Sequence, residues 1–160
     1  MTKKIRNKKG FSVIEILVAI AIITFGLAGV LSVTTFSLKI SSVIKETNQA
    51  NFLTKEAIEA VRGFRDQTEW PASGLGALTN DTPYHPALDS SSPPQWQILA
   101  GEENIGIFSR KVVFSSVQRD GNYNIVEAGG VIDQDTKKAT ATVSWKNKQV
   151  EIITYFTNWK

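Results

Sequence analysis

Residues 8–38 read KKGFSVIEILVAIAIITFGLAGVLSVTTFSL, and this stretch decides the fold. Between Ile16 and Leu38 it contains no charged side chain. A helix of these 23 residues is about 34 Å long, and the hydrocarbon core of a membrane is about 30 Å thick. A helix in the core of a soluble protein is rarely apolar on every side over such a length. The stretch therefore predicts a helix that spans a membrane.

The helical pattern continues beyond the apolar stretch. Apolar side chains recur there at intervals of three and four residues, with charged side chains between them. They are Ile40, Val43, Ile44, Ala50, Leu53, Ala57, Ile58, Val61 and Phe64. The first proline is Pro71, so we predict one continuous helix from about Phe11 to about Arg65, on the order of 80 Å long. Gly26 and Gly29 each weaken the helix by about 1 kcal/mol relative to alanine, which predicts a bend or a stretch that can unwind there.

Residues 66–95 have a different composition. All five prolines of the chain lie in this segment, together with the run Ser90-Ser91-Ser92. Proline interrupts helices and lacks the N–H group that a central strand needs. The segment is therefore predicted to be a long surface loop.

The remaining residues are typical of a β-sheet. Residues 96–100, 107–118 and 123–132 are rich in β-branched and aromatic side chains. Residues 139–145 alternate between apolar and hydroxyl side chains, which is the period of a strand. The Lys146-Asn147-Lys148 turn then predicts a hairpin with residues 150–157.

These segments predict an α+β fold, in which a long N-terminal helix packs on a C-terminal antiparallel β-sheet. The expected organisation is a basic N-terminal segment at residues 1–10, a transmembrane half of the helix at residues 11–38, and a globular domain at residues 39–160. Within that domain we expect the amphipathic helix at 39–65, the loop at 66–95 and the sheet at 96–160.

Composition and charge exclude several classes of function. The chain has no cysteine and a single histidine, His85, so it offers no disulfide, thiolate metal site or cysteine nucleophile. Its net charge is +3, but five of its 18 basic residues fall within residues 1–10. The rest of the chain has 18 − 5 = 13 basic and 15 acidic residues, a balance of −2. The basic excess therefore belongs to this short N-terminal segment and establishes no nucleic-acid contact.

The segment in front of the apolar stretch has an ordered pattern. Basic residues are followed by Gly10, Phe11, three residues of mostly apolar character, and Glu15. This pattern resembles the class III signal of type IV pilins and type II secretion pseudopilins. The resemblance implies cleavage between Gly10 and Phe11 by the prepilin peptidase, and methylation of the new Phe11 amine. It also implies the lollipop fold of that family, and the basic leader is expected to stay in the cytoplasm and leave the C-terminus outside.

Glu15 lies close to the start of the apolar stretch. A carboxylate inside a membrane helix costs on the order of 2.5–3.5 kcal/mol, and less near the interface, so it needs a partner. No lysine or arginine lies one or two turns along the helix to neutralise it. The resemblance implies that the partner is the N-terminal amine of a neighbouring processed subunit, which is mostly protonated at neutral pH.

The function expected from this resemblance is that of a structural filament subunit, and not of an enzyme. Its partners would be the prepilin peptidase, other pilin or pseudopilin subunits, an inner-membrane assembly platform and membrane lipid, with no cofactor and no metal. The residues 22–29 look most like the minor pilin and pseudopilin group. The filament would be a type IV pilus, a secretion pseudopilus or a DNA-uptake filament. The subunit would lie in the cytoplasmic membrane, with one span, and reach the cell surface or periplasm after assembly.

Two alternatives concern the anchor itself. The basic segment and apolar stretch also resemble a general secretory signal, but no small-x-small cleavage site directly follows the apolar run, and Glu15 would be unusual there. The main alternative is an uncleaved single-pass anchor that displays a small extracytoplasmic binding domain.

Other candidate sites favour structural interpretations. Glu127, Asp133 and Asp135 could bind calcium, but Lys137 and Lys138 adjoin them, which favours a solvated turn. A second group, His85, Asp89 and the three serines, contains the residue types of a hydrolase triad without an elbow motif. The tryptophans could form a binding platform, but such side chains more often pack a small sheet against a helix. These are Trp70, Trp96, Trp145 and Trp159.

Overall fold

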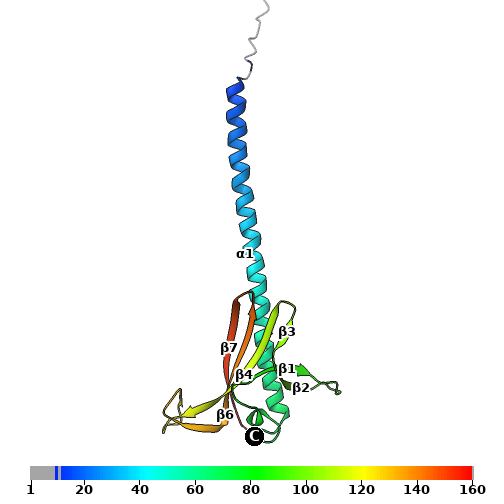
Figure 1. The fold of residues 1–160 in the computed structure, drawn as a ribbon, viewed down its shortest axis with the longest axis vertical. Helices are drawn as coiled ribbons and strands as arrows, with labels where there is room; N and C mark the ends of the chain where they lie inside the picture. Colours follow the sequence, from blue (N-terminus) through cyan, green and yellow to red (C-terminus); the bar gives the residue numbers. More distant parts are fainter. Residues whose placement is uncertain (1–9, 11, 160) are drawn as a thin grey trace, which may run out of the picture. The chain divides into compact units, whose positions relative to one another are not determined.

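The structure is a computed structural model that describes residue 10 and residues 12–159. Its helix α1 spans Val13–Gln67 without interruption (Figure 1). The expected long helix is confirmed, and its ends lie two residues further along the chain than predicted. The helix α1 is continuous through Gly26 and Gly29, and the capacity of this stretch to unwind stays a prediction.

The chain divides into two compact units between Lys45 and Glu46. From Val13 to Lys45 the first unit is helical, and from Ser12 to Lys45 every residue is exposed. The second unit holds the end of α1 and all the strands. Its first buried residue is Ala50, which has no exposed surface.

The segment after the helix is not the loop that its prolines predict. It contains the short 3-10 helix η1 (Leu75–Ala77) and the strand β1 (Pro83–Leu88). The prediction failed because β1 pairs with its neighbour β4 only at Pro83 and Tyr84. Few N–H groups of β1 are therefore needed as hydrogen-bond donors to β4. Its other neighbour, β2 (Trp96–Ala100), pairs with it from Tyr84 to Leu88. Proline is tolerated in a strand where a ladder hydrogen bond is not required.

Five further strands complete an antiparallel sheet with the path β2-β1-β4-β6-β7. They are β3 (Glu103–Ile105), β4 (Phe108–Arg119), β5 (Ile125–Val126), β6 (Val131–Trp145) and β7 (Lys148–Thr157). The strands β3 and β5 both pair with β4. The expected strand at 123–132 was wrong, because β5 is only two residues long and β6 begins at Val131. The hairpin of β6 and β7 is confirmed.

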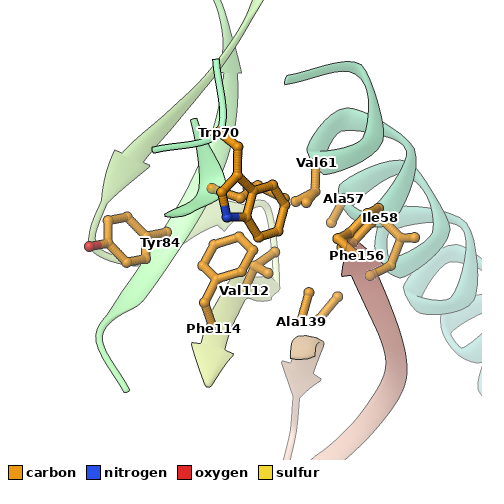
Figure 2. Close-up of a cluster of buried hydrophobic side chains, with 11 residues drawn as sticks. Ala57, Ile58, Val61, Trp70, Tyr84, Val112, Phe114, Ala139 and Phe156 are labelled. Carbon is orange, nitrogen blue, oxygen red and sulfur yellow. The ribbon is translucent and has the colours of Figure 1, made fainter. Parts of the chain in front are cut away.

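The core lies between the sheet and the second half of α1. Trp70, Phe114 and Phe156 fill its centre, and Figure 2 shows how they meet Ala57, Ile58 and Val61 of the helix. Burial of one such aromatic side chain stabilises the fold by about 1.5–3 kcal/mol. A smaller cluster joins the helix to the other end of the sheet and consists of Ala50, Leu53, Phe108, Val143 and Trp145.

Two buried cations hold the periphery of this core. The Arg110 guanidinium of β4 is 4% exposed and binds Glu56 of α1 at 3.1 Å and Glu103 of β3 at 2.5 Å. The Lys137 ammonium of β6 donates hydrogen bonds to the carbonyl of Leu78 at 2.6 Å and to Asn80 Oδ1 at 2.8 Å. Burial lowers the pKa of Lys137. These contacts fix β3 and the segment after η1 to the sheet.

Candidate processing and assembly site

Gly10 lies in front of α1 and is exposed. An added Cβ at this position would meet no described atom within 4 Å. The described part of the chain therefore places no demand for glycine there and leaves room for a bulkier side chain. Phe11, the expected site of methylation, and the expected leader at residues 1–9 lie outside the described residues.

Glu15 lies in the first turn of α1. The Ser12 carbonyl accepts hydrogen bonds from the N–H groups of Glu15 at 3.0 Å and Ile16 at 3.3 Å, so Ser12 begins the helix. A negative side chain in the first turn interacts favourably with the helix dipole. The pattern Ser12-Val13-Ile14-Glu15 is the sequence signature of a capping box, a signal that our sequence analysis missed.

The Glu15 carboxylate makes no hydrogen bond or ion pair with any residue that the structure describes. Its side chain is exposed, as are those of its neighbours along the helix. The dipole of the helix provides only a partial charge, worth typically 0.3–1 kcal/mol or so at an exposed position. The carboxylate is therefore available to a group outside this chain.

The apolar surface that follows Glu15 is extensive. Large side chains point outward on every side of the helix, and Phe25 is 80% and Ile22 67% exposed. The most apolar part of α1 has a mean hydropathy of 2.7, and none of it is buried within the chain. By length and composition this helix can cross a membrane, as predicted.

The threonine hydroxyl groups within the apolar surface are satisfied by the helix itself. Thr24 Oγ1 donates to the carbonyl of Ile20 at 2.8 Å, and Thr34 Oγ1 donates to that of Leu31 at 2.9 Å. Thr35 bonds the carbonyls of Leu31 and Ser32 in the same way. A hydroxyl bonded in this way costs less in a lipid environment than an unsatisfied one. Glu15 is thus the charged side chain of this segment, and the described structure gives it no partner.

The other candidate groups from the sequence are placed apart or used structurally. His85 Nδ1 lies 3.2 Å from the carbonyl of Gly101, while Asp89 Oδ1 accepts hydrogen bonds from Ser91 and Gln95 within its own loop. The described residues contain no group of three or more histidine or acidic side chains that could hold a metal ion. Asp133 instead binds Arg119 at 2.6 Å and lies in β6, so the solvated turn expected there was wrong.

The tryptophans do not form one platform. Trp70 and Trp145 are buried in the two separate clusters of the core. The Trp70 indole donates a hydrogen bond to the Gln134 carbonyl at 3.0 Å. The Trp96 ring lies close to Gly63 of α1, where an added Cβ would come within 2.7 Å of the ring. The packing role expected for these three residues is confirmed.

The comparisons with known proteins agree with the N-terminal pattern. Residues 5–31 match a family model described as the prokaryotic N-terminal methylation motif. The match covers 27 of the 160 residues and includes Gly10, Phe11 and Glu15. No curated protein and no solved structure matches the chain. The chain carries the prokaryotic N-terminal methylation motif, the signal of type IV pilins and pseudopilins, in front of an α+β fold with one long apolar helix.

Proposed function

We propose that this chain is a type IV pilin-like or pseudopilin-like subunit, which assembles with other subunits through the apolar half of α1. The observation that carries the proposal is the charge of Glu15 at the start of an uncovered apolar helix. A carboxylate in that place costs free energy in the membrane, and the described chain offers it no counter-charge. A subunit that gains a partner by assembling recovers this cost.

The counter-charge is the α-amine of Phe11 on a neighbouring subunit. Cleavage between Gly10 and Phe11 by the prepilin peptidase creates this amine, and the same enzyme methylates it. An ion pair in surroundings of low dielectric has a large Coulomb term but also a desolvation cost, so its geometry must be good. Only a processed neighbour can supply it, which makes assembly depend on processing.

The remaining assignments follow from this role. The basic leader keeps the N-terminus in the cytoplasm, so the sheet domain lies on the outer side of the cytoplasmic membrane. The subunit then enters a filament at the cell surface or in the periplasm. Membrane lipid and an inner-membrane assembly platform hold the subunit before assembly. We assign it a minor position in the filament, on the glycine and leucine pattern of residues 22–29. The chain acts structurally and not as an enzyme.

The test compares Glu15→Ala and Glu15→Gln with the wild type in cells that contain the cognate machinery. Removal of the charge makes the helix more apolar, so membrane insertion and cleavage should survive. The variants should accumulate as processed monomers and be absent from filaments sheared off the cells. The matched control is Glu59→Ala, because Glu59 is an exposed carboxylate of the same helix that pairs with Arg62. It should assemble normally.

Two results contradict the proposal. Equal amounts of wild type and Glu15→Ala in the sheared filaments would remove the assembly role of Glu15. A wild-type chain that stays in the membrane, is never found in filaments and keeps residues 1–10 would favour the anchored binding domain. Loss of cleavage in Glu15→Ala would instead mean that the peptidase reads the carboxylate, before assembly begins.

A further inference from the structure

The sheet has a projecting arm that the proposed role of α1 does not use. The register between β4 and β6 shifts between Ser116 and Val117. Beyond this irregularity the end of β4, β5 and the start of β6 form a hairpin extension, residues 117–135, which we call the arm. Figure 1 shows the arm, in yellow to orange, extending away from the rest of the sheet.

The tip of the arm is apolar and uncovered. Tyr123 is 81%, Val131 79% and Ile132 51% exposed, and these three side chains line one hollow of about 640 Å³. An exposed apolar patch on a soluble domain commonly marks an interaction surface.

The backbone around this patch is well held. Arg119 binds the Asp133 carboxylate at 2.6 Å and the Tyr123 carbonyl at 2.8 Å. The Asp120 carboxylate accepts hydrogen bonds from the N–H groups of Asn122 and Asn124. Because its conformation is already fixed, the tip would lose little conformational entropy on docking.

The arm is also acidic. Residues 119–135 contain one basic side chain, Arg119, and four acidic side chains, a balance of 1 − 4 = −3. Arg119 is already paired with Asp133. Glu127 makes no ion pair or hydrogen bond through its side chain with any described residue. A partner surface for this tip should therefore be basic and offer apolar contact.

A basic surface with apolar contact lies at the opposite end of β4 and β6. The turn between β3 and β4 and the turn between β6 and β7 border a hollow of about 460 Å³. We call it the basic hollow, because its charged lining residues are Lys146, which already pairs with Glu46 at 2.6 Å, and Lys148. Ile107, 52% exposed, provides apolar surface there. Lys148 has no ion pair with the residues that the structure describes.

The arm and the basic hollow cannot meet within one chain. The 12-residue strand β4 separates them, since it runs from Phe108 beside the hollow to Arg119 in the arm, a length of about 36 Å at about 3.3 Å per residue. A contact between two different surfaces of identical subunits is heterologous, and such contacts build open filaments when their rotation does not close a ring.

We propose that the arm of one copy docks in the basic hollow of a second copy, with Tyr123, Val131 and Ile132 against Ile107, and Glu127 facing Lys148. This inference rests on the proposed function and requires two copies of the chain to be neighbours in a filament. It adds a head-to-tail contact between sheet domains to the contact made by the helices.

The absence of cysteine from the sequence gives a clean test by crosslinking. One copy carries Val131→Cys and the other carries Gln149→Cys, which lines the basic hollow. Both are expressed with the cognate machinery, and sheared filaments are treated with a short bismaleimide. We expect a crosslinked dimer when both variants are present and none with either variant alone. Ser90→Cys, in the exposed loop after β1, replaces Val131→Cys as the control and should give no dimer.

Charge reversal tests the proposed pair. Glu127→Lys and Lys148→Glu should each lower the dimer yield about two- to fivefold, and the double variant should restore it. A dimer formed by Val131→Cys alone would indicate a symmetric contact and overturn the proposal. A crosslinked adduct of another mass would identify a different partner and would also overturn the proposal. Filaments that contain the chain but give no dimer overturn this inference alone, whereas absence of the wild-type chain from filaments overturns the proposed function with it.

Discussion

Lys146 Nζ lies 2.6 Å from Glu46 Oε1, so the turn between β6 and β7 is bonded to the first residue of the second unit. The Trp145 indole donates to the other oxygen of Glu46 at 3.2 Å. The hydrogen bond and the charge of Lys146 together hold the pKa of Glu46 below its usual range. Lys146 and Asn147 have φ of 43° and 61°, the left-handed conformation of a two-residue hairpin turn. The sheet domain therefore includes the helix at least from Glu46 onward.

The first prediction concerns a fragment that begins at Lys39. It retains Glu46 and the buried Ala50 and Leu53, and lacks the apolar stretch. It should be soluble, show strand signal in circular dichroism and melt cooperatively. A fragment that begins at Thr54 loses all three residues and should melt at a lower temperature. Persistent aggregation of the longer fragment without strand signal would count against an independent domain.

The second prediction concerns processing. Replacement of Gly10 by a bulky residue such as leucine should leave the precursor unprocessed in the membrane, because glycine, which has no Cβ, fits a crowded subsite of the peptidase. No described atom lies close to this position, so loss of cleavage would not be due to a clash within the chain. Intact-mass measurement of protein extracted from membranes distinguishes the two forms, which differ by residues 1–10 in the wild type. Ser12→Ala is the control, since it changes a neighbouring side chain and should be cleaved. Cleavage of the Gly10 variant at the wild-type rate would disprove the prediction.

A matched pair of adjacent carboxylates provides the third prediction. Glu103 binds the buried guanidinium of Arg110, whereas Glu102 binds Lys111 at the surface, with both side chains at least 40% exposed. Glu103→Ala should cost about 2 kcal/mol, because it leaves a buried cation with only Glu56. Glu102→Ala should cost less than about 1 kcal/mol. Urea unfolding measures both. Equal losses would mean that burial of Arg110 does not matter.

The fourth prediction is a dependence of stability on pH. The hydrogen bond from Arg119, with one from Thr136, lowers the pKa of Asp133. A lowered pKa stabilises the folded state above the ordinary value of the carboxyl group, about 4, and this contribution is lost as the pH falls through the folded pKa. Asp133→Asn should cost about 0.5–1 kcal/mol at pH 7, and the difference from wild type should vanish in strong acid.

Denaturant unfolding at several pH values tests this dependence. Glu127→Gln, which removes an exposed carboxylate of the same arm, should have little effect on stability at any of them. A difference between wild type and Asp133→Asn that grows as the pH falls would contradict the assignment.

Elements with a strong local pattern could be predicted from the sequence. The helix has an apolar stretch followed by three- and four-residue spacing, and both features survive in α1. Residues 96–100 were predicted with the observed bounds of β2, and the alternation of residues 139–145 lies within β6. In these segments the local preference and the final packing agree.

The elements that were missed depend on contacts far along the chain. The start of β6, residues 131–138, contains two aspartates and two lysines and looks like a turn, yet pairing with β4 makes it a strand. Lys137 is buried because Leu78 and Asn80 come to it from 57 and more residues away. No local pattern pairs Glu46 with Lys146 across 100 positions.

For the candidate site, the sequence was the better guide. The motif around Gly10, Phe11 and Glu15 is local and is matched as a family signal. The single chain adds that Glu15 is in the first helical turn and that its carboxylate has no described partner. Its role in assembly stays a prediction, since the proposed partner belongs to another subunit.

The hairpin of β1 and β2 gives the domain a place where its surface can change independently. Because β1 meets β4 at only two residues, the ladder of β4, β6 and β7 forms without the rest of the hairpin. Its connecting loop is closed by the Asp89 carboxylate, which binds the N–H groups of Ser91 and Gln95. Each doubling of a flexible loop costs only about 0.6 kcal/mol. A peptide inserted after Ser90 would therefore change the surface of the domain at this loop, with little effect on folding.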